Sequence, residues 1–477
     1  MRGRRIVIIL SVLILGAVAF GSWQWWRWTY LHMALDPQAK IDPGRTYEID
    51  VWVEMGDGLV PPPSLDDQFW SNVAVEFQSS YPNAQISFKA VAQAELEKEM
   101  QTAVTVGRPP HVLVTSSEWF RFWSDLQLPI DRFLPEAERG QYFPAALARV
   151  VVGQNHMAWP SQIQPRLWVI NQRRLQQLHS DADLVLAAWE QVATWSGDDW
   201  YNLRDKLKQL RDLRLSPIAH QLGTSEPMLQ VLVTAGQGLV GQDGELLISA
   251  ELIRSLCSEW QAMEKEQFVS WIQGTLLTDF FSNRRAIIGP VGLWIWSLGD
   301  NARRRGYRAL TVPDDVMLLP PPGSSGSGGY LSGTMVDVAV FRHRRFQGLA
   351  HARLSMELAR DLSQKLGIEM SRTGLGVPAN RRLLDEWQSI VGWSLEQRTS
   401  LQRVLEQPMG LPSLDRQWHE ARRQMVDQLL EPALEDLIHG RIGLDVAEEL
   451  ETKLRLFLEP LQASRSKGKS RQSRNTE

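Results

Sequence analysis

The chain has one cysteine, Cys257, among its 477 residues, so it cannot form an internal disulfide. It also lacks the Cys and His spacing of a zinc site, a phosphate-binding loop and the nucleophile motif of hydrolases. We therefore expect no catalytic residues, no metal site and no cofactor. The net charge of −4 excludes a nucleic-acid-binding protein that relies on a strongly basic surface.

Neither disorder nor a polytopic membrane protein fits the composition, because 43% of the residues are hydrophobic and 22% are charged. The length predicts two or three domains. Tryptophan is the unusual residue: the chain has 20 copies, where about 6 would be ordinary. Such an excess needs either a large aromatic core or a ligand that aromatic rings recognise.

The N-terminus has the features of an export segment. Three arginines stand among the first five residues, an apolar run extends from Ile6 to Phe20, and a tryptophan cluster follows at 23–28. This pattern fits a secretory signal cleaved near Ala19, or an uncleaved transmembrane helix with tryptophans at the membrane interface. We favour the uncleaved anchor. In both cases the arginines keep the N-terminus inside, and the rest of the chain is extracytoplasmic.

Alternation and helical spacing predict the next elements. Tyr47–Val53, Ile86–Val91 and His111–Thr115 have the patterns of strands, and Leu65–Tyr81 and Glu95–Val106 have those of helices. This order predicts an α/β domain with a parallel sheet.

Seven short segments carry a resemblance to a known family, and they occur in the family's order. They are Tyr81–Ile86, Thr102–Val112, Leu128–Asp131, Trp159–Asn171, Ala286–Pro290, Gly328–Gly333 and Gly374–Asn380. Together the chain resembles family 1 extracellular solute-binding proteins, the sugar-type binding components of ABC importers. The similarity runs from about Tyr47 to Leu461.

The resemblance implies a two-lobed periplasmic-binding-protein fold of the α/β class, with hinge strands between the lobes. The boundaries it implies are a signal or anchor helix at 1–30, a linker at 31–45, lobe 1 at 46–158 and 333–405, and lobe 2 at 159–332 and 406–461. The hinge crossings would lie near 159–165 and 328–333. The basic segment 462–477, which has almost no apolar residue, is expected to be a disordered tail.

The function implied is capture of a carbohydrate or polyol-like solute between the lobes and its delivery to ABC permease subunits. A membrane-anchored ligand-sensing or envelope scaffold with the same fold is the alternative, and a carbohydrate-active enzyme is a weaker one. The partners would be the small-molecule solute, the permease and the membrane, with no nucleic acid. The location would be periplasmic, with the N-terminal helix holding the protein on the cytoplasmic membrane.

Indole rings cover the apolar face of a sugar, while carboxylates and amides bind its hydroxyl groups. Aromatic and polar side chains that follow strands, or lie at the crossings, are therefore the candidate ligand contacts. These are Glu54, Asp57, Ser117, Glu118, Trp119, Trp159, Gln162, Gln164, Trp294, Trp296, Tyr330 and Trp418. His343 and His351 have no carboxylate at ligand spacing, and we expect them on the surface.

Overall fold

The computed structural model describes most of the chain from Leu35 onward. The described residues are 16, 18, 20–23, 35–56, 68–116, 126–152, 154–171, 218–221, 226–235, 238–241, 244–267, 269–272, 287–292, 316–319, 333–372, 376–391, 398–399, 401–402, 405–406, 421–422 and 424–474.

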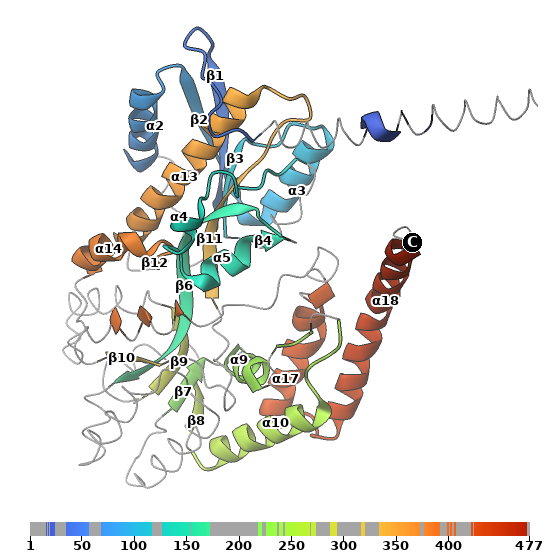
Figure 1. Ribbon diagram of the computed structural model, residues 1–477. Coiled ribbons are helices and arrows are strands. Elements are labelled where there is room, and N and C mark those ends of the chain that lie inside the picture. Colours follow the sequence, from blue (N-terminus) through green and yellow to red (C-terminus); the bar gives the residue numbers. More distant parts are fainter. Residues whose placement is uncertain are drawn as a thin grey trace, which may run out of the picture.

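Within the described residues, ten strands form one sheet, shown in Figure 1, in the order β2-β1-β3-β11-β6-β9-β7-β8, with β10 and β12 also paired to β6. Their bounds are β1 Tyr47–Met55, β2 Ala84–Ala92, β3 Val112–Thr115, β6 Ala158–Asn171, β7 Ile218–Gln221, β8 Val269–Ile272, β9 Ile287–Gly292, β10 Val316–Leu319, β11 Gly333–Val340 and β12 Val377–Pro378. A separate hairpin joins β4 Val151–Val152 to β5 Asn155–His156.

One long strand joins two halves of the molecule. β6 has 14 residues, and its first part pairs with β11 and β12 while its second part pairs with β9 and β10. Separate hydrophobic cores lie on either side of the change of partners, one around Ile49, Val114 and Leu362, the other around Ile218, Trp260 and Leu434. Two cores on a shared strand confirm a two-lobed α/β molecule.

Helices cover the sheet in both lobes (Figure 1). In lobe 1 these are α2 Gln68–Ser80, α3 Gln93–Thr105, α4 Glu136–Arg139, α5 Pro144–Val150, α13 Leu349–Arg372 and α14 Leu384–Val391, with the 3-10 turn η2 Arg381–Leu383. In lobe 2, α9 Glu226–Ala235 and α10 Ala250–Lys265 contact the sheet, while the π-helical turn η3 Val426–Leu430, α17 Glu431–Ile438 and α18 Val446–Arg474 pack against these helices and one another. The longer helices bury an apolar stripe; α2, for example, buries Trp70, Val73 and Phe77.

The expected disorder of residues 462–477 is wrong for most of that segment. α18 continues through it to Arg474, and the Gln462 side chain donates a hydrogen bond of 2.8 Å to the carbonyl of Gly244. Extending an existing helix costs far less than nucleating a new one, so a polar segment can stay helical after a packed start.

Among the residues that the structure describes, no helix is both long enough and apolar enough to cross a membrane. Residues 1–15, which hold most of the N-terminal apolar run, lie outside the described part of the chain.

Helix α13 packs closely on β6. A Cβ atom at Gly367 would lie 2.8 Å from the backbone oxygen of Ser161, and the Ser161 hydroxyl donates to the carbonyl of Ser363 at 2.7 Å. Glycine at position 367 therefore allows the helix to approach the strand that joins the lobes.

We expect Gly367→Ala to destabilise the protein by about 1–3 kcal/mol through overpacking, despite the roughly 1 kcal/mol that alanine gains over glycine inside a helix. Denaturant unfolding of both proteins measures the difference. A variant more stable than the parent would show that the close approach of helix and strand is not needed.

Candidate functional site

The strand directions place the carboxyl ends of both lobes opposite each other. β1 and β3 are parallel, and β6 shares their direction because β3 and β6 are both antiparallel to β11. β6 runs from lobe 1 into lobe 2, so β1 and β3 end facing lobe 2. β7, β8 and β9 are parallel to one another, and β9 is antiparallel to β6, so these strands end facing lobe 1. Open α/β sheets bind ligands at such strand ends. We call this region the interlobe site.

Glu54 lies at the lobe 1 side of the interlobe site, near the end of β1, and only 4% of it is exposed. Its carboxylate accepts hydrogen bonds from the Thr115 hydroxyl, from the Ser116 backbone N–H at 2.8 Å and from the Ser116 hydroxyl at 3.2 Å. This carboxylate therefore fixes the end of β3, at the point where the chain leaves the sheet.

A buried ion pair lies beside it. The Arg149 guanidinium, on α5, is 3.2 Å from the Asp337 carboxylate on β11, and it donates to the Ser116 carbonyl at 2.8 Å. Arg149 is 8% exposed and Asp337 is fully buried. Since Asp337 is opposite Thr115 in the sheet, Glu54, Ser116, Arg149 and Asp337 form one polar cluster. We call it the lobe 1 polar cluster.

Two glutamines of β6 continue this row toward lobe 2. Gln164 donates to the Gln162 side-chain oxygen at 3.0 Å, and Gln162 is fully buried. The Nε2 atom of Gln162 has no hydrogen-bond partner within the described residues. A methyl group at Gly376 would overlap this amide, so glycine there makes room for Gln162. A buried amide without a partner costs about 1–3 kcal/mol, and a ligand hydroxyl would relieve that cost.

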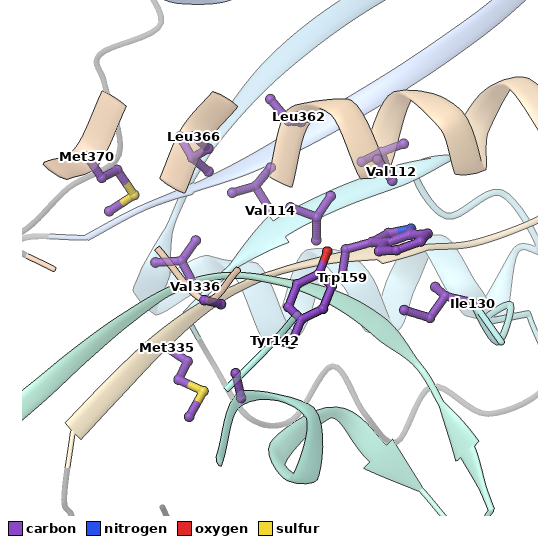
Figure 2. Packing of buried hydrophobic residues seen from close by; sticks show 14 of the residues in the cluster. Val112, Val114, Ile130, Tyr142, Trp159, Met335, Val336, Leu362, Leu366 and Met370 are labelled. Atoms are coloured by element: carbon purple, nitrogen blue, oxygen red, sulfur yellow. The ribbon is translucent and has the colours of Figure 1, made fainter. Parts of the chain in front are cut away.

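Trp159 is the second residue of the same strand and lies inside the lobe 1 core, with no exposed surface. Figure 2 shows its indole among Val114, Ile130 and Tyr142. The Arg360 guanidinium lies 5.9 Å from the ring centre. In this conformation Trp159 supports the wall of the site by packing, and its role as a ligand contact stays a prediction.

Of the twelve candidate contacts, the structure therefore brings Glu54, Gln162 and Gln164 to the interlobe site and encloses Trp159 in the core. The other eight lie outside the described residues: Asp57, Ser117, Glu118, Trp119, Trp294, Trp296, Tyr330 and Trp418. Several of them follow a described strand directly, since β3 ends at Thr115 and β9 at Gly292.

Sequence reasoning missed Arg149 and Asp337. One signal was available for each, a charged residue within an apolar stretch: Arg149 in Ala145–Val152 and Asp337 in Met335–Phe341. A charge in a buried segment needs a partner, but the two residues are 188 positions apart.

Lobe 2 has an aromatic cluster in its core. His220, near the end of β7, contacts the rings of Trp168, Trp260 and Trp271 at centroid distances of 5.0, 4.9 and 5.3 Å. Trp70, Trp168 and Trp260 are each only 1% exposed. Core packing therefore accounts for part of the tryptophan excess.

Burial lowers the pKa of His220 from its ordinary 6.5 to about 4, although its hydrogen bond to the Gly289 carbonyl works in the opposite direction. The unfolded chain takes up a proton below about pH 6.5, and the folded chain does so only near pH 4. The stability that the folded protein gains by holding His220 neutral is therefore fully present above pH 6.5, and it is lost as the pH falls toward 4.

We expect the free energy of unfolding to fall by about 2 kcal/mol between pH 7 and pH 5, because His220 takes up a proton in the unfolded chain and not in the folded one. His220→Gln keeps a donor for Gly289 and cannot titrate, so its stability should depend less on pH over this range. Thermal unfolding of both proteins at several pH values measures this. Equal pH dependence would show that His220 does not titrate as described.

Comparison with solved structures gives the same architecture. The sugar-binding protein MalE from the phytopathogen Xanthomonas citri is 14% identical, with a TM-score of 0.65 over 88% of this chain and 99% of that chain. The cyclic alpha-maltosyl-1,6-maltose binding protein from Arthrobacter globiformis is 11% identical, with a TM-score of 0.63 over 87% of this chain and 100% of that chain.

A putative oligosaccharide periplasmic-binding protein from Synechococcus sp. MITs9220 is 15% identical, with a TM-score of 0.58 over 87% of this chain and 99% of that chain. No family model matches the sequence, and no curated protein matches it. These similarities confirm the two-lobed fold expected from the seven sequence segments.

Proposed function

We propose that this protein is an extracytoplasmic solute-binding protein that captures a carbohydrate between its two lobes. The observation that carries the proposal is the arrangement of the sheet: strands from both lobes end opposite each other, on either side of the shared strand β6. A ligand in this place touches both lobes at once. The similar solved structures are sugar-binding and oligosaccharide-binding proteins, which supports a carbohydrate as the ligand.

Binding would act by closure of the lobes. Contacts made by one ligand to both lobes stabilise a closed state over an open one, without covalent chemistry. The closed, loaded protein would then deliver the sugar to the permease subunits of an ABC importer. In this account the protein is not an enzyme.

The polar side of the ligand site would be formed by Glu54, Gln162 and Gln164, whose carboxylate and amides suit sugar hydroxyl groups. The Nε2 donor of Gln162, which has no hydrogen-bond partner among the residues that the structure describes, supports this assignment most directly. The aromatic side would come from Trp119, Trp294, Trp296, Tyr330 and Trp418, with Asp57, Ser117 and Glu118 as further polar contacts and Trp159 behind the wall.

The location is part of the same proposal. Residues 1–30 would hold the protein on the outer face of the cytoplasmic membrane, with 31–45 as the linker. Lobe 1 would comprise 46–158 and 333–405, and lobe 2 would comprise 159–332 and 406–461. The position of β6, which starts at Ala158 and ends in the lobe 2 sheet, supports a crossing near 159–165.

A thermal-shift screen of the full chain in mild detergent tests the function. The panel holds maltose, maltotriose, maltotetraose, polyols, glycerophosphodiesters and amino acids. A ligand at 100 times its Kd adds about 2.7 kcal/mol of stability, which corresponds to a rise of about 3 °C in Tm for a chain of this length. No shift with any sugar would overturn the proposal and favour a scaffold role, and turnover of a bound sugar would favour an enzyme.

A matched pair of variants locates the ligand. Gln162→Leu should weaken sugar binding about tenfold or more, because it removes a buried donor. Gln101→Leu, an exposed position on α3, should bind as the parent does. Equal binding by both variants would remove Gln162 from the site.

A further inference from the structure

The end of lobe 1 that points away from lobe 2 contains a cavity. Its volume is about 1180 Å³, and its lining includes Arg45, Asp50, Arg108, Arg344, Arg345 and Gln347. These residues come from the start of β1, the chain after α3 and the chain between β11 and α13. His111 directly precedes β3 and is hydrogen-bonded to Asp50 and Gln347, which line the cavity, so the cavity is at the opposite end of β3 from the interlobe site. We call it the arginine pocket.

A histidine cluster adjoins the pocket through His343, which is part of the pocket lining. The His111 ring stacks on His343 at a centroid distance of 4.2 Å and lies 4.4 Å from His351. His351 is 7% exposed, which corrects the expectation of a surface position, and His343 is half-buried. Both join His111 because β11 and α13 pack against β1 and β3. Burial lowers the pKa of all three histidines, that of His111 to about 3.

Gln347 connects two of these histidines. Its side-chain oxygen is 2.9 Å from Nε2 of His111, and its amide nitrogen is 3.1 Å from Nδ1 of His343. Nε2 of His343 donates to the Pro109 carbonyl, and Nδ1 of His111 accepts from the Asp50 backbone N–H. Each ring thus has one donor and one acceptor in use, which is the pattern of neutral imidazole.

These hydrogen bonds argue against a metal ion bound by Asp50, His111 and His343. Asp50, His111 and His343 have ligand atoms within 4.8 Å of one another. The lone pairs that a metal would need are already used by the Asp50 N–H and the Gln347 amide, and four arginines surround the opening. The positive charge of the pocket therefore comes from arginine, and the histidines are neutral supports.

The four arginines are available to a ligand. All four side chains are exposed, and within the described part of the chain none of them is in an ion pair. Arg45 donates to the Gln347 carbonyl at 2.8 Å, which fixes it at the rim. The single acidic group of the lining, Asp50, already accepts from the Ser87 hydroxyl at 2.7 Å. Gln347 and Gly348 also lead directly into the N-terminus of α13, the end of a helix that favours anions.

We propose that the arginine pocket binds a phosphate-type anionic group. Guanidinium groups match phosphate oxygens in paired hydrogen bonds, and several of them around one opening recognise such a group without a metal. Two sources share this chemistry: the headgroups of anionic phospholipids and soluble phosphate compounds. The lipid source has the stronger support, because Arg45 ends the linker that joins lobe 1 to the proposed membrane anchor. Bound headgroups would hold this end of lobe 1 against the membrane surface.

Hydrogen exchange of the full chain tests this proposal, followed at the backbone amides of 106–108, 111 and 343–348. The chain is placed in nanodiscs of phosphatidylcholine, with or without phosphatidylglycerol, and separately in neutral detergent with inorganic phosphate. Protection only with phosphatidylglycerol identifies lipid headgroups as the source, and protection by phosphate in detergent identifies a soluble anion. No protection in either arm overturns the proposal.

The double variant Arg344→Glu/Arg345→Glu should weaken binding of the anion that gives protection by about tenfold or more. Lys98→Glu/Arg382→Glu is the matched control, since it changes the net charge equally at exposed positions that do not line the pocket. An equal loss of binding in the control variant would show that net charge, and not the arginine pocket, accounts for the binding, and it would overturn the proposal. Should the first variant unfold, Arg345→Gln alone gives the same comparison, with a weakening expected and unchanged affinity contradicting the proposal.

Discussion

Arg149→Ala is expected to lower the free energy of unfolding by about 3–5 kcal/mol, because it leaves the buried Asp337 carboxylate without the charge that faces it. The guanidinium also holds the Ser116 carbonyl, so the end of β3 loses a support at the same time. Denaturant unfolding followed by tryptophan fluorescence measures the loss. We expect sugar affinity to fall as well, since Ser116 lies at the interlobe site.

Two further variants separate this effect from a general loss of charge. Arg139→Ala removes an ion pair with Asp131 whose partners are 32% and 25% exposed, and it should cost about 1 kcal/mol or less. Arg149→Met combined with Asp337→Leu should recover most of the stability, since both charges of the pair are removed together and neither is left buried without the other. An Arg149→Ala variant no less stable than Arg139→Ala would contradict the importance of the buried pair.

Trp159→Ala is expected to destabilise lobe 1 by about 3–5 kcal/mol, the range found when a buried aromatic residue is reduced to alanine. The ring has no exposed surface and packs among Val114, Ile130 and Tyr142 (Figure 2). The effect of Trp159 variants on stability and on sugar affinity tests whether this side chain acts by packing in the core or by contacting the ligand.

Trp159→Phe makes the distinction, because it keeps most of the packing and reduces the aromatic surface. If Trp159 acts through the core, this variant loses stability while its sugar affinity stays within about threefold of the parent, a difference under 1 kcal/mol. A sugar affinity that falls further, with stability unchanged, would show that Trp159 contacts the ligand.

Local patterns in the sequence predict the first elements of lobe 1 well. The alternation at Tyr47–Val53 became β1, and the helical spacing of Trp70, Val73 and Phe77 became the buried face of α2. Such elements follow from the period of the apolar residues, which depends only on neighbours in the chain. Their ends shifted by a few residues, because hydrogen bonds with other strands set the last paired residue.

Contacts between distant segments could not be read in the same way. The Arg149–Asp337 pair and the cluster of His111, His343 and His351 depend on β11 lying antiparallel to β3. No local pattern fixes that pairing. Trp159 illustrates the reverse case: its place at the crossing was predicted, but the direction of its side chain depends on packing that only the folded lobe decides.

Lobe closure around a carbohydrate is the central claim, and a distance measurement across the hinge tests it most directly. Ala94→Cys on α3 and Ser255→Cys on α10 are exposed positions in different lobes. The native Cys257 is buried and its thiol pKa is raised to about 12, so spin labels attach only to the introduced pair. Pulsed electron paramagnetic resonance then gives the distance with and without the sugar found in the screen. We predict a shift of several ångströms at saturating sugar; an unchanged distance with sugar bound would contradict closure.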